Sequence, residues 1–236
     1  MALSFQKLKK LQEEAGAQKS SKLNQLFSTH PDLDARERRQ VLYSKMFHFM
    51  KCHKVITVPV QLGEVCASAG IELVPLSEIV RGTGLPENAV FSIWGNTDGA
   101  VNCYQNRYRI AYNDNQPSGR IRFTISEEIA HIVYGHVNDP AFSLFRQDYS
   151  NEKYAQYDEE ARLGAGFLVC PPKFFYSYDK VLKPEHLSRL CGISLPCAEA
   201  RHDIFTKYKS EITSNLAYQF SAIPQSSLNI RKVVGF

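Results

Sequence analysis

The sequence lacks any apolar run long enough to cross a membrane. A membrane-spanning helix needs about 20 consecutive apolar residues, whereas runs such as VITVPV and GFLVC are much shorter. The N-terminus, MALSFQKLKKLQEEAG, also lacks the apolar centre and the cleavage-site pattern of a secretory signal peptide. These absences predict a cytoplasmic protein that does not contact a membrane.

Closely paired cysteines and a strong excess of one charge are absent too. The six cysteines lie in apolar surroundings without C-x-x-C spacing, in a chain too large to need disulfides, so they predict reduced thiols in a core. A formal net charge of +4 is too small to argue for nucleic-acid binding without a focused basic patch. Apolar residues, by contrast, are plentiful: they make up 44% of the 236 residues and support a sizeable core.

The distribution of these residues predicts three regions. Residues 1–40 are rich in lysine, glutamine and glutamate, which predicts a helical and partly disordered extension. Apolar residues become denser from about residue 41, so the main folded domain is expected over 41–210. Its core motifs lie in 107–172 and a C-terminal pair of helices in 184–205, and residues 211–236 form a polar tail.

The first half of this domain predicts a helix and several strands. A helix is expected from about Pro59 to Gly70, followed by the short strand IELVPL. The runs AVFSIWG, GAVNCYQ and RYRIAYN are rich in β-forming residues and are separated by turn residues. This pattern is typical of an antiparallel meander.

The second half predicts helices. One helix carries IRFTISEEIAHIVY and ends near Gly135. Another is expected over about 153–168, with small residues along one stripe that would let a second helix approach closely. The last pair is expected to turn at Gly192.

The segment SEEIAH resembles the zinc-protease motif H-E-x-x-H, with Glu127 in place of the first histidine. Residues i and i+4 of a helix point the same way, so Glu127 and His131 present their side chains together, with Glu128 about 100° around the helix. A divalent metal ion takes two ligands in this way, and the intervening glutamate can handle the proton of a water molecule. Glu160, near the start of the small-residue helix, is the expected third ligand. His136 is expected to be a packed histidine rather than a ligand.

Three blocks of the chain together resemble the ImmA/IrrE-type zinc metallopeptidases. They are RIRFTISEEIAHIVYGH, EEARLGAGFLVCPP, and LSRLCGIS with the cysteine and arginine that follow it. The family patterns are R-F-T-x-x-H-E-x-x-H, then E-x-x-A-x-x-F-A-x-x-L-L-M-P, then L-x-x-x-F-x-V-S-x-x-A-x-x-x-R. The similarity covers about residues 55–205.

This resemblance implies a zinc-dependent endopeptidase that cleaves a regulatory protein, such as a transcriptional repressor. It implies that His131 and Glu160 are metal ligands, that Glu127 stands at the position of the first histidine ligand, and that Glu128 is the catalytic base. A site with two carboxylates and one imidazole shifts the metal preference from zinc toward manganese or iron.

Three alternatives remain open. The loss of the first histidine also fits a pseudoprotease that binds a regulatory partner without cutting it. Thr124 and Glu127 match the S/T-x-x-E pattern of a helix-capping box. The segment LSRLCGISLPCAEARHDI has the skeleton of a DNA-binding helix-turn-helix, but its second helix carries one arginine among two acids, which argues against direct contact with DNA.

The expected fold class is therefore α+β and zincin-like. A short antiparallel sheet would pack on the motif helix and its small-residue partner, with helical additions at both ends.

Overall fold

A computed structural model describes residues 34–55, 57–93, 97–105, 107–139, 142, 152–171 and 183–211. The chain divides into two compact units, Met1–Arg38 and Arg39–Phe236. The expected extension before residue 34 and the polar tail after residue 211 lie outside the described residues. Of the first unit, residues 34–38 are described, and they include the start of helix α2 (Ala35–Cys52).

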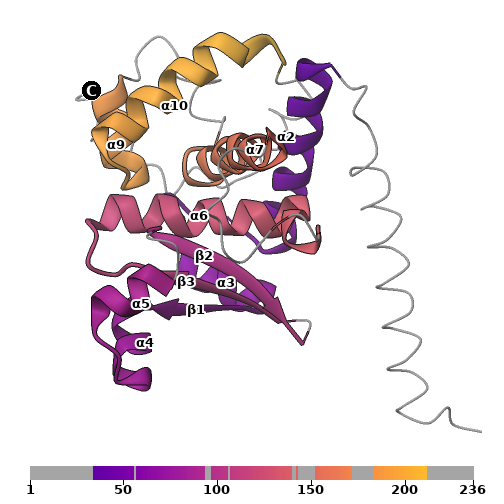
Figure 1. Ribbon diagram of the computed structural model, residues 1–236. Coiled ribbons are helices and arrows are strands. Elements are labelled where there is room, and N and C mark those ends of the chain that lie inside the picture. The colour runs from indigo at the N-terminus through magenta and orange to yellow at the C-terminus, as the bar shows by residue number, and fades with distance from the viewer. Residues whose placement is uncertain are drawn as a thin grey trace, which may run out of the picture. The chain divides into compact units, whose positions relative to one another are not determined.

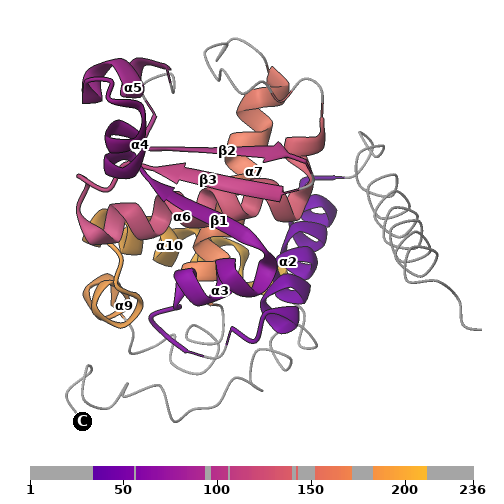
Figure 2. The same cartoon turned by 90° about the horizontal axis from the view of Figure 1, so that it is seen from below.

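The second unit contains a small mixed sheet. Its strands are β1 (Ile71–Pro75), β2 (Gly99–Tyr104) and β3 (Arg107–Tyr112). β3 lies between the other two, as the view from below shows (Figure 2). The antiparallel pair of β2 and β3 confirms the predicted hairpin, whereas β1 runs parallel to β3 and makes the sheet mixed rather than purely antiparallel. The parallel pairing is possible because a long crossover separates β1 from β3.

The run AVFSIWG was expected to be a strand, and this expectation is wrong. The described part of the run belongs to α5 (Glu87–Ile93), which follows α4 (Leu76–Thr83). Glu87 suits the first turn of a helix, and the carbonyl of Pro86 accepts hydrogen bonds from the backbone N–H groups of Ala89 and Val90. Val90 is the residue of α5 that is buried, which suits one face of a short helix.

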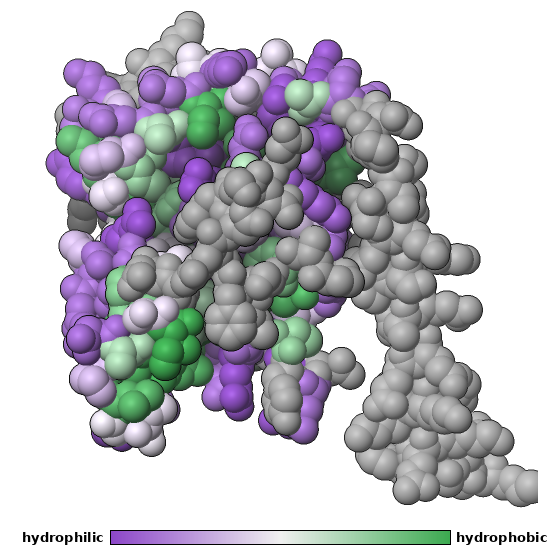
Figure 3. Space-filling model, in the orientation of Figure 1, coloured by the Kyte–Doolittle hydropathy of each residue, from purple (hydrophilic) through white to green (hydrophobic). Residues whose placement is uncertain are grey.

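Two large apolar side chains, one just before α5 and one at its end, are exposed. Leu85 is 42% exposed and Ile93 is 58% exposed. Figure 3 shows apolar residues gathered over α4 and α5, at the lower left of that face. The residues of this run have a high β propensity, yet they form part of a helical hairpin. Packing outweighs local propensity here.

Helices that end at glycines connect these elements. α3 (Leu62–Ala69) ends at Gly70, which has a φ of 68° and leads directly into β1. α6 (Ser118–Tyr134), which carries the motif, ends at Gly135 with a φ of 80°. Both stops are where the sequence predicts them, because a left-handed residue after the last turn is most favourable as glycine. The short helix η1 (His136–Asn138) follows directly.

Helix α6 is the centre of the second unit. It packs on β2 and β3 and also against α7 (Glu152–Val169) (Figure 1). Small residues of α7 allow the close approach that the sequence predicts: a Cβ atom added to Gly164 would lie 2.4 Å from the Tyr134 hydroxyl oxygen. Ile125 and Ile129 of α6 are buried in the core.

The C-terminal helices form the predicted pair. α9 (Pro184–Cys191) turns at Gly192, with a φ of 64°, into α10 (Leu195–Tyr208). The Ser194 hydroxyl accepts a hydrogen bond from the Cys197 backbone N–H and caps α10. The short helix η2 (Lys209–Glu211) follows.

The six cysteines are free, as predicted, but they do not all lie in the core. Cys66, Cys170 and Cys191 are buried, whereas Cys52 and Cys103 are exposed. Within the described ranges, no helix is both long enough and apolar enough to span a membrane.

Candidate functional site

The motif residues lie near the middle of α6. Because this helix begins at Ser118, Thr124 and Glu127 are within its body and do not form a capping box at its start. Arg122, also on α6, donates a hydrogen bond to the Val60 carbonyl and ties the helix to the segment before α3. The side chains of Glu127, Glu128 and His131 therefore come from a helix fixed on several sides.

These three side chains line a cavity of about 270 Å³ between α6, α7 and the start of β2. The charged or ionisable groups of its lining are Asp98, Arg120, Glu127, Glu128, His131, Tyr154, Asp158 and Arg162. The face of α6 on which Glu127 and His131 were predicted to meet is thus directed into a cavity. The sequence could not show which other segments would form its walls.

Glu128 lies deep in this cavity, close to the backbone of β2. Glu128 is 3% exposed, and a Cβ atom added to Gly99 would lie 3.3 Å from the Glu128 Oε1 atom. The same Cβ atom would lie 2.5 Å from the Thr124 Cγ2 atom, which is too close for any side chain. A glycine at the start of β2 therefore allows this strand to lie against the motif face of α6.

Glu127 carries a perturbed carboxyl group. Burial, and after it the negative charge of Glu128, raise the pKa of Glu127 to about 7. Arg162 opposes this shift, with its Nε atom 3.6 Å from Glu127 Oε1. Near neutral pH this side chain therefore holds a proton part of the time.

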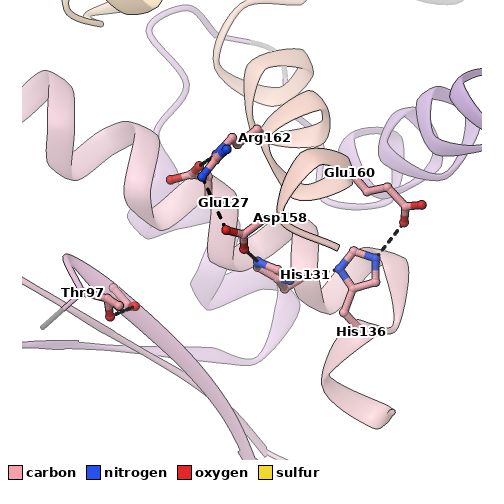
Figure 4. Close-up of polar contacts among 8 residues, drawn as sticks. Thr97, Glu127, His131, His136, Asp158, Glu160 and Arg162 are labelled. Carbon is pink, nitrogen blue, oxygen red and sulfur yellow. Dashed lines mark hydrogen bonds and ion pairs between the residues drawn. The ribbon is translucent and has the colours of Figure 1, made fainter. Parts of the chain in front are cut away.

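From α7, the cavity receives Asp158 rather than the expected Glu160. Asp158 Oδ1 lies 3.8 Å from His131 Nε2, and Asp158 Oδ2 lies 3.4 Å from the Nη2 atom of Arg162. Figure 4 shows Glu127, Asp158 and Arg162 meeting between the two helices. Glu160 is directed to another partner, since its Oε2 atom lies 3.0 Å from His136 Nε2.

Asp158 was missed in the sequence, although the spacing of the second family pattern points to it. When the final proline of E-x-x-A-x-x-F-A-x-x-L-L-M-P is placed on Pro171, the leading acid falls on Asp158. The two alanines of the pattern then fall on Ala161 and Ala165. An aspartate in place of the glutamate, with two glutamates directly after it, concealed the correspondence.

His136 is packed, as the sequence predicts, and it also contacts the motif histidine. It is 4% exposed, and its Nδ1 atom lies 3.0 Å from the Nδ1 atom of His131. Burial lowers the pKa of His136, and the Glu160 carboxylate partly offsets this effect. The sequence gives no signal that His131 and His136 meet. Gly135 ends α6 between them, so the spacing rules of a single helix do not relate the two residues.

The acidic groups do not form a ready-made cage for a metal ion. Across the described ranges, no three side chains of histidine, cysteine, aspartate or glutamate are arranged to hold an ion. The guanidinium group of Arg162 lies near both Glu127 and Asp158 and supplies a positive charge there.

Comparison with known families agrees with the α+β, zincin-like fold. Residues 86–201 match the peptidase M78 family, described as the IrrE N-terminal-like domain. The matched segment includes every residue that lines the cavity, from Thr97 to Arg162. No curated protein matches the chain. Because the family match covers the motif helix, the cavity and the C-terminal pair up to Arg201, residues 86–201 form an IrrE N-terminal-like domain of the ImmA/IrrE-type metallopeptidase family.

Proposed function

We propose that the protein is a metal-dependent endopeptidase in which Glu127, His131 and Asp158 hold the metal ion and Glu128 is the catalytic base. The observation that carries this proposal is the cavity, into which two helices direct one imidazole and three carboxylates. The family supports a protein substrate, and we infer a regulatory protein such as a transcriptional repressor.

The chemistry of the residues fits a divalent cation. The guanidinium group of Arg162 lies near both Glu127 and Asp158, and this placement of a cation supports a divalent ion at the same position. Arg162 is 66% exposed, so its side chain has room to move out toward solvent. Two carboxylates and an imidazole are established ligands for zinc, and the second carboxylate favours manganese or iron more than a second histidine would.

When bound, a metal ion supplies Lewis-acid polarisation of the peptide carbonyl. Two observations support Glu128 as the base: it is adjacent to Glu127, and it is a buried residue of the cavity lining. It takes a proton from the attacking water and returns it to the leaving amine. Gly99 keeps the approach to this carboxylate open because it has no side chain.

Metal content of the purified full-length protein tests the proposal. The protein is prepared without a metal-affinity tag, supplied with zinc or manganese, and analysed for bound metal. We expect about one ion per chain in the wild type, and loss of the ion in Glu127→Ala, His131→Ala and Asp158→Asn. Glu159→Gln is the matched control, because Glu159 is an exposed acid on the same helix as Asp158. A wild type that stays metal-free after metal is supplied contradicts the proposal.

Arg162 also favours a second candidate, a pseudoprotease that binds a regulatory partner without cleaving it. In this case its guanidinium group permanently takes the place of the metal ion between Glu127 and Asp158. Arg162→Gln distinguishes the two candidates. For an endopeptidase we expect the wild type to bind metal and the variant to bind it equally well or better, because a competing cation is removed. For a pseudoprotease we expect the wild type to stay metal-free and the variant alone to gain affinity for metal.

A further inference from the structure

A chain of hydrogen bonds leads from the cavity into the protein behind it. His131 Nδ1 lies 3.0 Å from His136 Nδ1, and His136 Nε2 lies 3.0 Å from Glu160 Oε2. The other oxygen of Glu160 accepts a hydrogen bond of 2.7 Å from the Gln156 side chain. Both histidines are buried, at 2% and 4% exposure. Figure 4 shows His131, His136 and Glu160 in this order, with His131 also facing Asp158.

Aromatic side chains hold the two imidazole rings in place. The Tyr157 ring stacks on His136, with a centroid distance of 4.2 Å and an angle of 16° between the planes. The Phe142 ring lies 4.9 Å from the ring of His131. Tyr157 is itself fixed, because its hydroxyl donates a hydrogen bond to Asp139. Rotation of the His136 ring would therefore require Tyr157 to move, and rotation of the His131 ring would require Phe142 to move.

The contacts determine where the hydrogen atoms lie. An ionised carboxylate can only accept hydrogen bonds, so Glu160 favours a hydrogen on His136 Nε2. His136 Nδ1 then acts as an acceptor, and the hydrogen between the two rings belongs to His131 Nδ1. This leaves the Nε2 atom of His131 without a hydrogen on the side of the cavity, 3.8 Å from Asp158.

We propose that Glu160 and His136 are positioning residues that fix His131 in the tautomer with its hydrogen on Nδ1, so that Nε2 presents its lone pair to the cavity. This inference rests on the proposed function, since a metal ion binds a histidine through such a lone pair. It gives Glu160, which the family resemblance suggested as a ligand, a role behind the ligand.

The first test reads the tautomer directly in the metal-free wild type. The full-length protein is labelled with ¹⁵N-histidine and treated with a chelator, and long-range proton–nitrogen correlations of the His131 ring are recorded by NMR. We expect the hydrogen on Nδ1. A hydrogen on Nε2 overturns the proposal.

The second test uses two substitutions of Glu160 that differ in a single property. Glu160→Met keeps the length of the side chain but removes the acceptor oxygen, whereas Glu160→Gln keeps an acceptor and removes the charge. We expect the affinity for Mn²⁺ or Zn²⁺ to fall about 10- to 100-fold in Glu160→Met, which is the usual effect of losing a partner of a metal-binding histidine. The NMR signals of His131 should then show a mixture of tautomers.

Glu160→Gln should stay within about threefold of the wild type, because its carbonyl oxygen still accepts the hydrogen of His136. Glu159→Met serves as the matched control on the exposed face of the same helix. If both Glu160 variants lose the metal equally while the tautomer of His131 is unchanged, Glu160 is a ligand and the proposal is wrong. An unchanged affinity in Glu160→Met also contradicts it.

Failure of the proposed function has a different signature. A wild type that binds neither metal contradicts the endopeptidase, whereas the tautomer in metal-free protein still decides whether Glu160 and His136 position His131.

Discussion

At the scale of single residues, Glu127 shows how burial and a neighbouring charge together shift the pKa of a carboxyl group. Its side chain is 24% exposed, it is next to Glu128, and the combined effect of burial and of that charge raises its pKa to about 7. A folded state that holds a proton more tightly than the unfolded chain loses stability as pH rises. The relevant window runs from the ordinary pKa of 4.5 to about 7.

We therefore predict that Glu127→Gln stabilises the metal-free protein above pH 7. Below about pH 4.5 Glu127 of the wild type is neutral, like the glutamine of the variant, so the two proteins should unfold alike. The difference in the free energy of unfolding should grow as pH rises through this window and level off at up to about 3 kcal/mol. Urea unfolding in the presence of a chelator, at several pH values between 4 and 8, measures this difference. The same difference at every pH would show that the ionisation of Glu127 is not its source.

Asp158 and Glu160 show the limit of motif reading at this scale. Both are acids on α7, and a difference of two positions directs one into the cavity and the other toward His136. Side chains two positions apart on a helix do not face the same way. An error of two residues in assigning a family motif therefore exchanges a candidate ligand for a residue that lies behind the site.

At the scale of the elements, the site depends on how closely β2 approaches α6. The backbone of Gly99 lies where any Cβ atom would be 2.5 Å from Thr124 Cγ2. Because Glu128 is beside the same glycine, a shift of β2 would also disturb the carboxylate that we propose as the base.

We predict that Gly99→Ala destabilises the protein by about 1–3 kcal/mol, as expected for a methyl group forced into a packed interface. Thr124→Ser removes the methyl group that the new Cβ atom would meet and keeps the hydroxyl. It should therefore recover a large part of the loss in the double variant, as a double-mutant cycle in urea unfolding would measure. Additive effects of the two substitutions would contradict the contact.

At the scale of the whole second unit, an ion pair joins its first and last described segments. Arg39 on α2 donates two hydrogen bonds, of 2.7 and 2.6 Å, to the carboxylate of Glu211 in η2. Both side chains are largely buried, at 17% and 12% exposure. The Arg39 guanidinium also lies 4.0 Å from the centre of the Tyr208 ring. The two residues are 172 positions apart in the sequence, and charged pairs with two hydrogen bonds are among the strongest polar contacts.

We predict that Glu211→Gln lowers the free energy of unfolding by about 1–3 kcal/mol, because Arg39 loses its charged partner. Glu199→Gln is the matched control, since Glu199 is an exposed acid on α10. Urea unfolding of the full-length protein measures both variants. Equal stability of the two would mean that the pair does not hold these segments together.

The sequence alone determined the features that depend on local spacing. Helices end at Gly70, Gly135 and Gly192 because a left-handed residue there favours glycine. Glu127 and His131 share a helix face because an α-helix repeats every 3.6 residues. The same local rules predicted the β2–β3 hairpin and the close approach of another helix to the small residues of α7.

Tertiary structure alone decided the features that depend on contacts between distant segments. The parallel pairing of β1 with β3 and the helical form of α5 are set by packing, which local propensity does not contain. The walls of the cavity, and the meeting of Asp158 with His131, require α6, α7 and β2 to be in place together. Local spacing determines which way a side chain faces on its own element, whereas the group that it meets depends on how the elements pack.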